Sequence, residues 1–169
     1  MAAAHPGLLT ILAPRHPERG AAIAAAAAPL LTTRRSLREE APAGEGIWIV
    51  DTLGEMGLWY RLAPIVFVGR SLVPPGGGQN PLEPARLGCA IAVGPHTGNF
   101  AEHVALLRQA DALGEVSDAP ALTGFVADML AHPERRQAMG CSAAAVVQRH
   151  GDLPARTAAA LRALLDRST

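Results

Sequence analysis

The chain lacks lysine entirely: all 15 of its basic residues are arginine, and 15 acidic residues balance them. Because no positive charge is in excess, electrostatics does not favour nucleic acid or anionic lipid as a partner. Without lysine the phosphate-binding P-loop motif cannot be present, and no GxGxxG motif follows the first apolar segment. These absences exclude the P-loop and dinucleotide-binding sites that are common in α/β proteins.

Cysteine and metal-binding patterns are equally scarce. The two cysteines, Cys89 and Cys141, are far apart and show no CxxC spacing, so neither a disulfide framework nor a zinc site is expected. Cys89 lies in an apolar run, where an inert reduced thiol of the core is the expected state. The six histidines show no metal-ligand spacing, and HExxH and DxD motifs are absent. We therefore expect neither a metal nor another cofactor.

Long hydrophobic runs are also missing. No apolar run approaches the length of about 20 residues that crosses a bilayer. Residues 1–20 lack the basic-then-apolar layout of a signal peptide. The chain is therefore expected to be soluble, and its 169 residues suit one ordinary domain.

What the sequence does contain is a regular alternation of short apolar segments and helical patterns. Unalternated apolar strands separated by helices are typical of a parallel sheet that is covered on both faces, so the sequence predicts an α/β, Rossmann-like fold. The predicted strands are 8–13, 30–33, 47–50, 65–68, 90–93 and 111–116. The predicted helices are 18–28, 54–62, 99–109, 119–131, 133–148 and 154–166, with Asp118 and Pro133 as start signals.

The turn after the first strand contains Pro14, Arg15 and His16. Ligands of parallel sheets gather at the carboxyl ends of the strands, so Arg15 could hold a phosphate through two parallel hydrogen bonds. The alternative is that Arg15 covers the sheet edge or pairs with Glu18, and the residues alone do not decide between them. A lone histidine beside a turn is more often structural than functional, which makes His16 a secondary candidate.

The turn after the strand 47–50 is a second candidate. Gly54 would let a ligand lie against the first turn of the following helix, whose end carries partial positive charge. The alternative is a capping sequence, with Thr52 as the cap and Glu55 three residues later completing a capping box. Taken by itself, this segment favours the capping interpretation.

The glycine-rich loop 74–78 and the residues after it are the third candidate. Prolines fix φ and glycines free it, so this loop could approach a ligand closely. Asn80 followed by Pro81 predicts the start of a short helix, and Glu83 then lies on the same face as Asn80. The Glu83 carboxylate could accept both hydroxyls of a ribose, or it could simply compensate the helix dipole.

The turn 94–99 is the fourth candidate. His96, Thr97 and Asn99 could contact a phosphate or cap the following helix, and capping is the favoured role of Asn99.

Four motifs share one order with a known family: PRHPER at 14–19, DTLGE at 51–55, NPLEPA at 80–85 and GPHTGNF at 94–100. Over nearly its whole length the chain resembles the C-terminal domain of 3-deoxy-D-manno-octulosonic acid (Kdo) transferases. The resemblance implies a GT-B glycosyltransferase with two Rossmann-like domains. It also implies transfer of Kdo from CMP-Kdo to a lipid A precursor, in lipopolysaccharide synthesis at the cytoplasmic face of the bacterial inner membrane.

The resemblance also implies a site. Arg15 and the amides of 53–55 would surround the cytidine and its phosphate, Glu83 would bind the ribose, and Asn80 would orient its loop. Helix-end amides would stabilise the charge on the departing CMP without a metal. The implied CMP contacts are Pro14, Arg15, Leu53, Gly54, Glu55, Asn80, Pro81, Leu82 and Glu83. Additional candidates near them are His16, Ser71, Gly77, Gly78, Gln79 and His96.

Three positions depart from the family pattern. The family usually has glycine where Arg70 stands, histidine where Gln79 stands and a bulky aromatic where Gly98 stands. A glutamine side chain can hydrogen-bond but cannot shuttle a proton, so acid–base chemistry at position 79 is not expected.

In the family, an N-terminal domain supplies the acceptor site, the catalytic carboxylate and the membrane attachment, and these residues contain nothing corresponding to it. We therefore expect residues 1–169 to form one CMP-Kdo-binding domain that transfers nothing alone, with residues 1–4 marking a truncation boundary. Two alternatives stay open at this point. One is a GT-B domain that uses a UDP sugar, and the other is a stand-alone, non-catalytic nucleotide-binding module.

Overall fold

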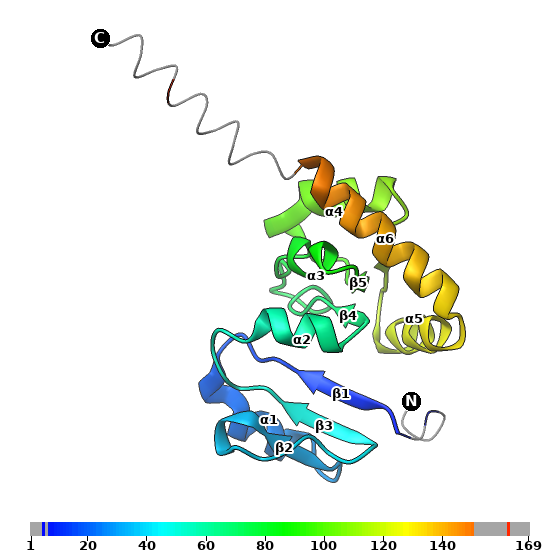
Figure 1. The fold of residues 1–169 in the computed structure, drawn as a ribbon. Helices are drawn as coiled ribbons and strands as arrows, with labels where there is room; N and C mark the ends of the chain where they lie inside the picture. The colour runs from blue at the N-terminus through cyan, green and yellow to red at the C-terminus, as the bar shows by residue number, and fades with distance from the viewer. Residues whose placement is uncertain (1–4, 6, 151–161, 163–169) are drawn as a thin grey trace. The chain divides into compact units, whose positions relative to one another are not determined.

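The structure, a computed structural model, describes residue 5, residues 7–150 and residue 162 (Figure 1). The chain divides after Ala63 into two compact units. Each unit contains one three-stranded sheet, and every strand pair is parallel. The predicted helix 154–166 lies outside the described residues except for residue 162.

The first unit has the strand order β1-β3-β2. Its elements are β1 (Leu9–Leu12), the 3-10 turn η2 (Pro17–Arg19), α1 (Gly20–Ala26), β2 (Thr32–Arg34), the 3-10 turn η3 (Arg35–Leu37), β3 (Gly46–Ile49) and α2 (Met56–Leu62). Leu9 of β1 and Thr32 of β2 lie opposite Gly46 and Ile47 of the central strand β3. All three strands therefore send their carboxyl ends to the same edge of this sheet.

Aromatic packing fixes the end of β3. Trp48 of β3 meets Trp59 of α2 with ring centroids 5.0 Å apart and ring planes at 76°, an edge-to-face arrangement that aromatic rings prefer. Ile49 and Val50 are buried, and α1 packs on β2 and β3. The turn 51–55 therefore follows a buried and well-packed strand end.

The second unit has the strand order β4-β5-β6. Its elements are β4 (Ile65–Phe67), α3 (Leu82–Arg86), β5 (Ala90–Val93), the 3-10 turn η4 (Gly98–Phe100), α4 (Ala101–Gln109), β6 (Gly114–Glu115), α5 (Ala119–Ala131) and α6 (Pro133–His150). Every residue of the central strand β5 is buried, as expected for a strand of a parallel sheet with both faces covered.

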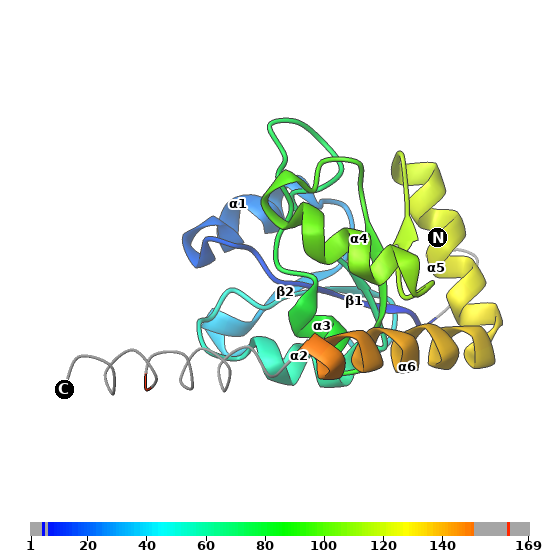
Figure 2. The ribbon, with the colours of Figure 1, turned by 90° about the horizontal axis from the view of Figure 1, so that it is seen from above.

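The helices of the second unit pack around β5. The long helix α6 lies beside α3 and contacts β5 and α5 (Figure 2). Where α6 passes the turn that follows α3, a Cβ atom on Gly140 would lie 2.0 Å from the Gly88 carbonyl oxygen, so only glycine fits there. Asp118 caps α5 by accepting a hydrogen bond from the Ala121 N–H at 2.7 Å, and α6 begins at Pro133, both as predicted.

The α/β class with parallel strands is thus confirmed, and most predicted elements occur near their predicted bounds. The predicted strand 111–116 is much shorter, because only Gly114 and Glu115 pair with β5. Asp111, with φ of 49°, lies in a left-handed turn after α4. Among the described residues no helix combines the length and the hydrophobicity that crossing a membrane requires.

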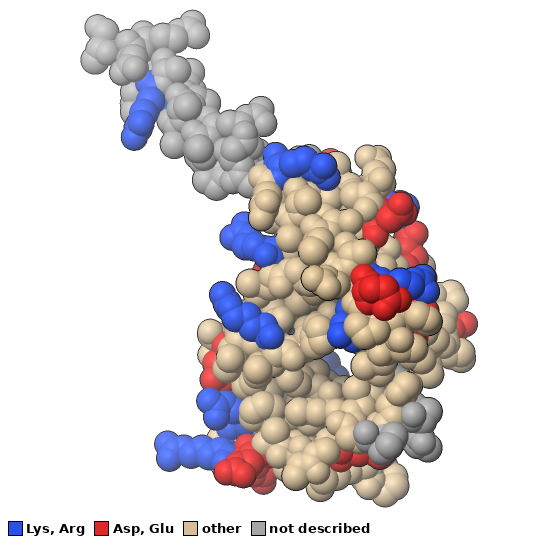
Figure 3. Space-filling view, turned by 45° about the vertical axis from the view of Figure 1, so that its right-hand side comes forward, with Lys and Arg blue, Asp and Glu red and all other residues tan. Residues whose placement is uncertain are grey.

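Charged side chains are scattered over the face of the molecule that Figure 3 shows. On the face seen in Figure 3 neutral residues predominate, and arginine and acidic side chains occur in small separate groups. This distribution agrees with the formal net charge of zero and offers no large basic surface to a polyanion on that face.

Candidate functional site

The turn after β1 presents Arg15 to solvent. No ion pair in the described part of the chain involves Arg15, so the predicted alternative of an Arg15–Glu18 pair is wrong. The neighbouring His16 faces that carboxylate instead, with Nδ1 3.5 Å from Glu18 Oε1. Pro14 is half-buried.

Asp51, two residues after the end of β3, connects three segments of the first unit. Its buried carboxylate accepts hydrogen bonds from Arg34 Nε at 2.9 Å, Arg34 Nη2 at 2.7 Å, Ser36 N at 2.9 Å and Ser36 Oγ at 2.8 Å. A Cβ atom on Gly20 would lie 2.1 Å from Asp51 Oδ2, so α1 can begin this close to Asp51 only with glycine. Burial raises the pKa of Asp51, but the hydrogen bonds from Ser36 and Arg34 outweigh burial and leave the pKa below its ordinary value.

Thr52 and Glu55 do not form the capping box that the sequence favoured. The helix α2 begins at Met56, and the residue at its N-cap, Glu55, makes no side-chain capping bond. Instead the Thr52 hydroxyl donates to the Glu55 carboxylate, and Arg35 donates through Nη2 at 2.9 Å and Nε at 3.4 Å. Hydrogen bonds from Arg35 and then Thr52 lower the pKa of Glu55, so this carboxylate is ionised at neutral pH.

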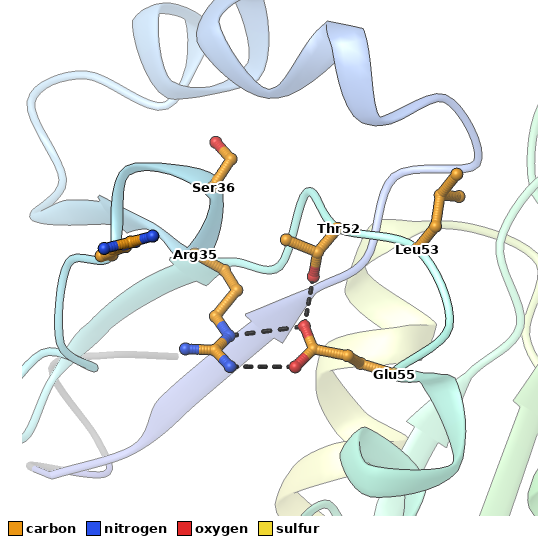
Figure 4. A pocket seen from close by; sticks show the side chains of 6 residues that line it. Arg35, Ser36, Thr52, Leu53 and Glu55 are labelled. Carbon is orange, nitrogen blue, oxygen red and sulfur yellow. Dashed lines mark hydrogen bonds and ion pairs between the residues drawn. The ribbon is translucent and has the colours of Figure 1, made fainter.

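These side chains line an open pocket of about 470 Å³ (Figure 4). Its lining residues are Arg35, Ser36, Arg38, Thr52, Leu53 and Glu55. Leu53 and Glu55 are two of the CMP contacts implied by the resemblance, and Gly54 between them has φ of 83°, a left-handed conformation that suits glycine. The Leu53 side chain is 82% exposed at the edge of this pocket.

The arginine-containing turn after β2 was not predicted as part of the site. The rule that ligands gather at strand carboxyl ends applies to β2 as it does to β1 and β3, and the sequence Arg34-Arg35-Ser36 stands at that end. That rule was the signal that could have identified these residues.

In the second unit, Asn80 orients the start of α3. Its Oδ1 accepts a hydrogen bond from the Leu82 N–H at 3.0 Å, and its Nδ2 lies 3.3 Å from Glu83 Oε1. The predicted proximity of Asn80 and Glu83 on one face is therefore confirmed. Pro81 is buried, Leu82 is half-buried and Glu83 is exposed.

The glycine loop packs against the turn 94–99. The Gly77 N–H donates to the His96 carbonyl and the Asn99 N–H donates to the Gly77 carbonyl, both at 3.0 Å. A Cβ atom on Gly76 would lie 2.3 Å from the Cβ of His96. The close packing of the glycine loop on the turn 94–99 thus requires the small glycine residues, independently of any ligand. The half-buried His96 and the candidates Gly77 and Gly78 belong to this joined pair of loops.

The predicted capping role of Asn99 is wrong. The helix α4 begins at Ala101 with Phe100 as its N-cap residue, and no side chain caps it. A 3-10 turn over Gly98–Phe100 precedes the helix, so Asn99 lies too early to cap it. Its side chain lies against Gly77 instead.

Ser71 joins the ends of β4 and β5. Its hydroxyl donates to the Val68 carbonyl at 2.6 Å and accepts from the Gly94 N–H at 2.8 Å, and the residue is fully buried. These contacts give Ser71 a structural role.

Gln79 is half-buried. Gly98 is exposed, and a Cβ atom added to it would meet nothing within 4 Å.

Burial raises the pKa of the Cys89 thiol to about 11, which agrees with the expected inert thiol of the core. Among the described residues, no three histidine, cysteine or acidic side chains gather as a metal site would require.

Comparison with known proteins identifies the family. No protein-family model matches the chain. The 3-deoxy-D-manno-octulosonic acid transferase of Bordetella pertussis is 38% identical over 162 residues, which cover 94% of this chain and 38% of that protein. The solved C-terminal CMP-Kdo binding domain of WaaA from Acinetobacter baumannii is 36% identical with a TM-score of 0.79, covering 83% of this chain and 74% of that one. The chain belongs to the Kdo transferase family.

The match to a solved C-terminal domain agrees with the part of a Kdo transferase that the four motifs indicated. The Kdo transferase of Haemophilus influenzae is 38% identical over 145 residues, covering 82% of this chain and 33% of that protein. The chain thus spans about a third of the length of the curated Kdo transferases that it matches.

Proposed function

We propose that this chain is the donor-binding domain of a Kdo transferase and that its ligand is CMP-Kdo. The observation that carries this proposal is the similarity, at 36% identity and a TM-score of 0.79, to a domain described as CMP-Kdo binding. That similarity extends over 83% of the chain, more than either compact unit contains by itself. The proposal therefore takes residues 1–169 as one donor-binding domain.

The CMP contacts in this proposal are Pro14, Arg15, Leu53, Gly54, Glu55, Asn80, Pro81, Leu82 and Glu83. Three local features support it. Arg15 is exposed and has no ion-pair partner in the described part of the chain, Glu55 is ionised beside an open pocket, and Asn80 holds Glu83 at the start of α3. The Glu83 carboxylate would accept charge-assisted hydrogen bonds from the ribose hydroxyls.

The activity we propose for the whole enzyme is transfer of Kdo from CMP-Kdo to a lipid A precursor in lipopolysaccharide synthesis. The acceptor site, the catalytic carboxylate and attachment to the cytoplasmic face of the inner membrane would come from the rest of that enzyme. Without an acceptor held near the donor, the chain alone should bind CMP and transfer nothing. Measurable Kdo transfer by the isolated chain would overturn this part of the proposal.

Calorimetric titration of CMP and UMP tests the donor. We expect CMP to bind more tightly than UMP. A Glu83→Ala variant should bind CMP roughly 10- to 150-fold more weakly, because hydrogen bonds to charged groups are worth about 1.5–3 kcal/mol. Glu102→Ala removes another exposed carboxylate of the same unit, on α4, and should leave the affinity unchanged. Equal affinity of the wild type and Glu83→Ala would remove Glu83 from the site, and tighter binding of UMP would contradict the donor.

A further inference from the structure

Three arginines lie at the end of β2 and in the turn that follows it, and only two of them form ion pairs. Arg34 forms an ion pair with Asp51, and Arg35 forms one with Glu55. The side chain of Arg38 has no hydrogen bond or ion pair with any residue that the structure describes. Two of the three positive charges are therefore neutralised locally, and Arg38 remains as an unmatched cation on the wall of the pocket.

The acidic residue nearest in sequence does not neutralise Arg38. The Glu39 carboxylate accepts a hydrogen bond from the backbone N–H of Arg34 at 2.6 Å. Arg38 ends the 3-10 turn η3 in a left-handed conformation with φ of 61°, and its own N–H donates to the Arg35 carbonyl at 2.9 Å. The short turn thereby brings Arg35 and Arg38 to the same pocket.

Arg35 retains free donors although it is paired. A guanidinium has five N–H donors, and Arg35 contacts Glu55 only through Nε and Nη2. Figure 4 shows this pairing along one edge of the guanidinium, with the other amino group pointing away from Glu55. The pocket therefore offers one unpaired guanidinium and one free edge of a second.

We propose that Arg38, together with the free edge of Arg35, binds an oxyanion of the ligand in this pocket. Guanidinium groups bind planar carboxylates and phosphate oxygens through paired hydrogen bonds, and both kinds of oxyanion occur in a nucleotide of an acidic sugar. The inference rests on the proposed function and adds to it a binding residue outside the four family motifs. The turn 53–55, which lines another part of the pocket, would then meet a different part of the same ligand.

The test compares three ligands that differ in their anionic groups. Calorimetry on the full chain would measure cytidine, CMP and CMP-Kdo against the wild type, Arg38→Ala and Arg38→Lys. Arg61→Ala is the matched control, because Arg61 is an exposed arginine of the same unit that does not line the pocket. We expect Arg38→Ala to leave the affinity for cytidine unchanged and to weaken the binding of an anionic ligand roughly tenfold. Arg38→Lys should have an intermediate effect, because lysine keeps the positive charge but lacks the paired donors of a guanidinium.

The ligands identify the oxyanion. Weaker binding of both CMP and CMP-Kdo to Arg38→Ala assigns the phosphate, and weaker binding of CMP-Kdo alone assigns the sugar carboxylate. Binding of all three ligands within twofold of the wild type overturns the inference while leaving the proposed function standing. An equal loss for cytidine also overturns it, because cytidine carries no anion.

A fourth probe separates this inference from the proposed function. If the wild type binds none of the three ligands, the proposed function fails, and inorganic phosphate then tests the anion site alone. Thermal stabilisation by phosphate that Arg38→Ala abolishes and Arg61→Ala keeps would support the anion site. If phosphate does not stabilise the wild type, or stabilises Arg38→Ala and Arg61→Ala equally, the proposed anion site is overturned.

Discussion

Arg34 and Asp51 form an ion pair that joins the carboxyl end of β2 to the carboxyl end of β3, with Arg34 Nη2 2.7 Å from Asp51 Oδ2. Arg35 and Thr52, the residues that directly follow the pair in sequence, line the pocket. Because the Asp51 carboxylate is buried and also accepts two hydrogen bonds from Ser36, the conformation of both turns depends on this one residue.

Replacing Asp51 should destabilise the first unit. Removing one partner of a buried pair costs about 3–5 kcal/mol, because the other charge loses its compensation. Urea unfolding of Asp51→Ala should show a markedly lower midpoint. Glu45→Ala, which removes an exposed carboxylate just before β3, should change it little. Equal midpoints for Asp51→Ala and the wild type would contradict the role of Asp51.

The same residue predicts a pH dependence. The pKa of Asp51 is lower in the folded protein than its ordinary value of 3.8, so its contribution is fully present above that value and is lost as the pH falls through the folded pKa. The stability of the wild type should therefore fall on acidification below about pH 3.8 more steeply than that of Asp51→Asn. Urea midpoints measured between about pH 7 and pH 2.5 check this difference, and parallel curves would contradict it.

Arg35 should control the ionisation of Glu55. Its hydrogen bonds are the largest cause of the lowered pKa of that carboxylate, so Arg35→Ala should move the pKa up towards the ordinary value of 4.5. NMR titration of the Glu55 carboxyl carbon measures the shift directly. Thr52→Val should give a shift in the same direction and of smaller size, because Thr52 is the second cause. Arg61→Ala should give none, and an unchanged pKa in Arg35→Ala would contradict the pairing.

A pair of glycines tests the joined loops of the second unit. Gly76→Ala should cost about 1–3 kcal/mol, the usual range for overpacking, because its Cβ would lie 2.3 Å from the Cβ of His96. Gly98→Ala should be close to neutral, because nothing lies within 4 Å of that position. Thermal unfolding of both variants is the measurement. Equal effects of the two substitutions would contradict the loop contact.

The elements of the fold were predictable from the sequence, because apolar runs and helical periodicity depend on local residues. The central strand β5 and the helix starts at Asp118 and Pro133 follow from such local patterns. The capping roles assigned to Thr52 and Asn99 were wrong for a different reason. The Thr52 hydroxyl bonds to the Glu55 carboxylate, which the distant Arg35 also holds, and the Asn99 side chain lies against the glycine loop.

The candidate site was predictable only in part. The turn 53–55 came from the family motif and lies at a pocket, whereas Arg35 and Arg38 lie outside every motif. Their place on the pocket wall depends on the hydrogen bonds of Asp51 to Ser36, which join residues 15 positions apart. No local pattern in the sequence contains such a pairing.

Two helical glycines give a second matched test of packing. Glycine to alanine inside a helix normally stabilises by about 1 kcal/mol, and Gly124 of α5, with no neighbour within 4 Å, should follow that rule. Gly140 of α6 should not, because its Cβ would meet the Gly88 carbonyl. We expect Gly124→Ala to raise the melting temperature and Gly140→Ala to lower it. A stabilising Gly140→Ala would contradict the close helix contact.

The two cysteines differ sharply in their surroundings, since Cys141 on α6 is exposed and Cys89 is buried with a raised pKa. A maleimide dye added near neutral pH should therefore couple to Cys141 alone. The native sequence thus already provides a single attachment point for a fluorophore, and ligand titrations can be followed optically without introducing a foreign thiol.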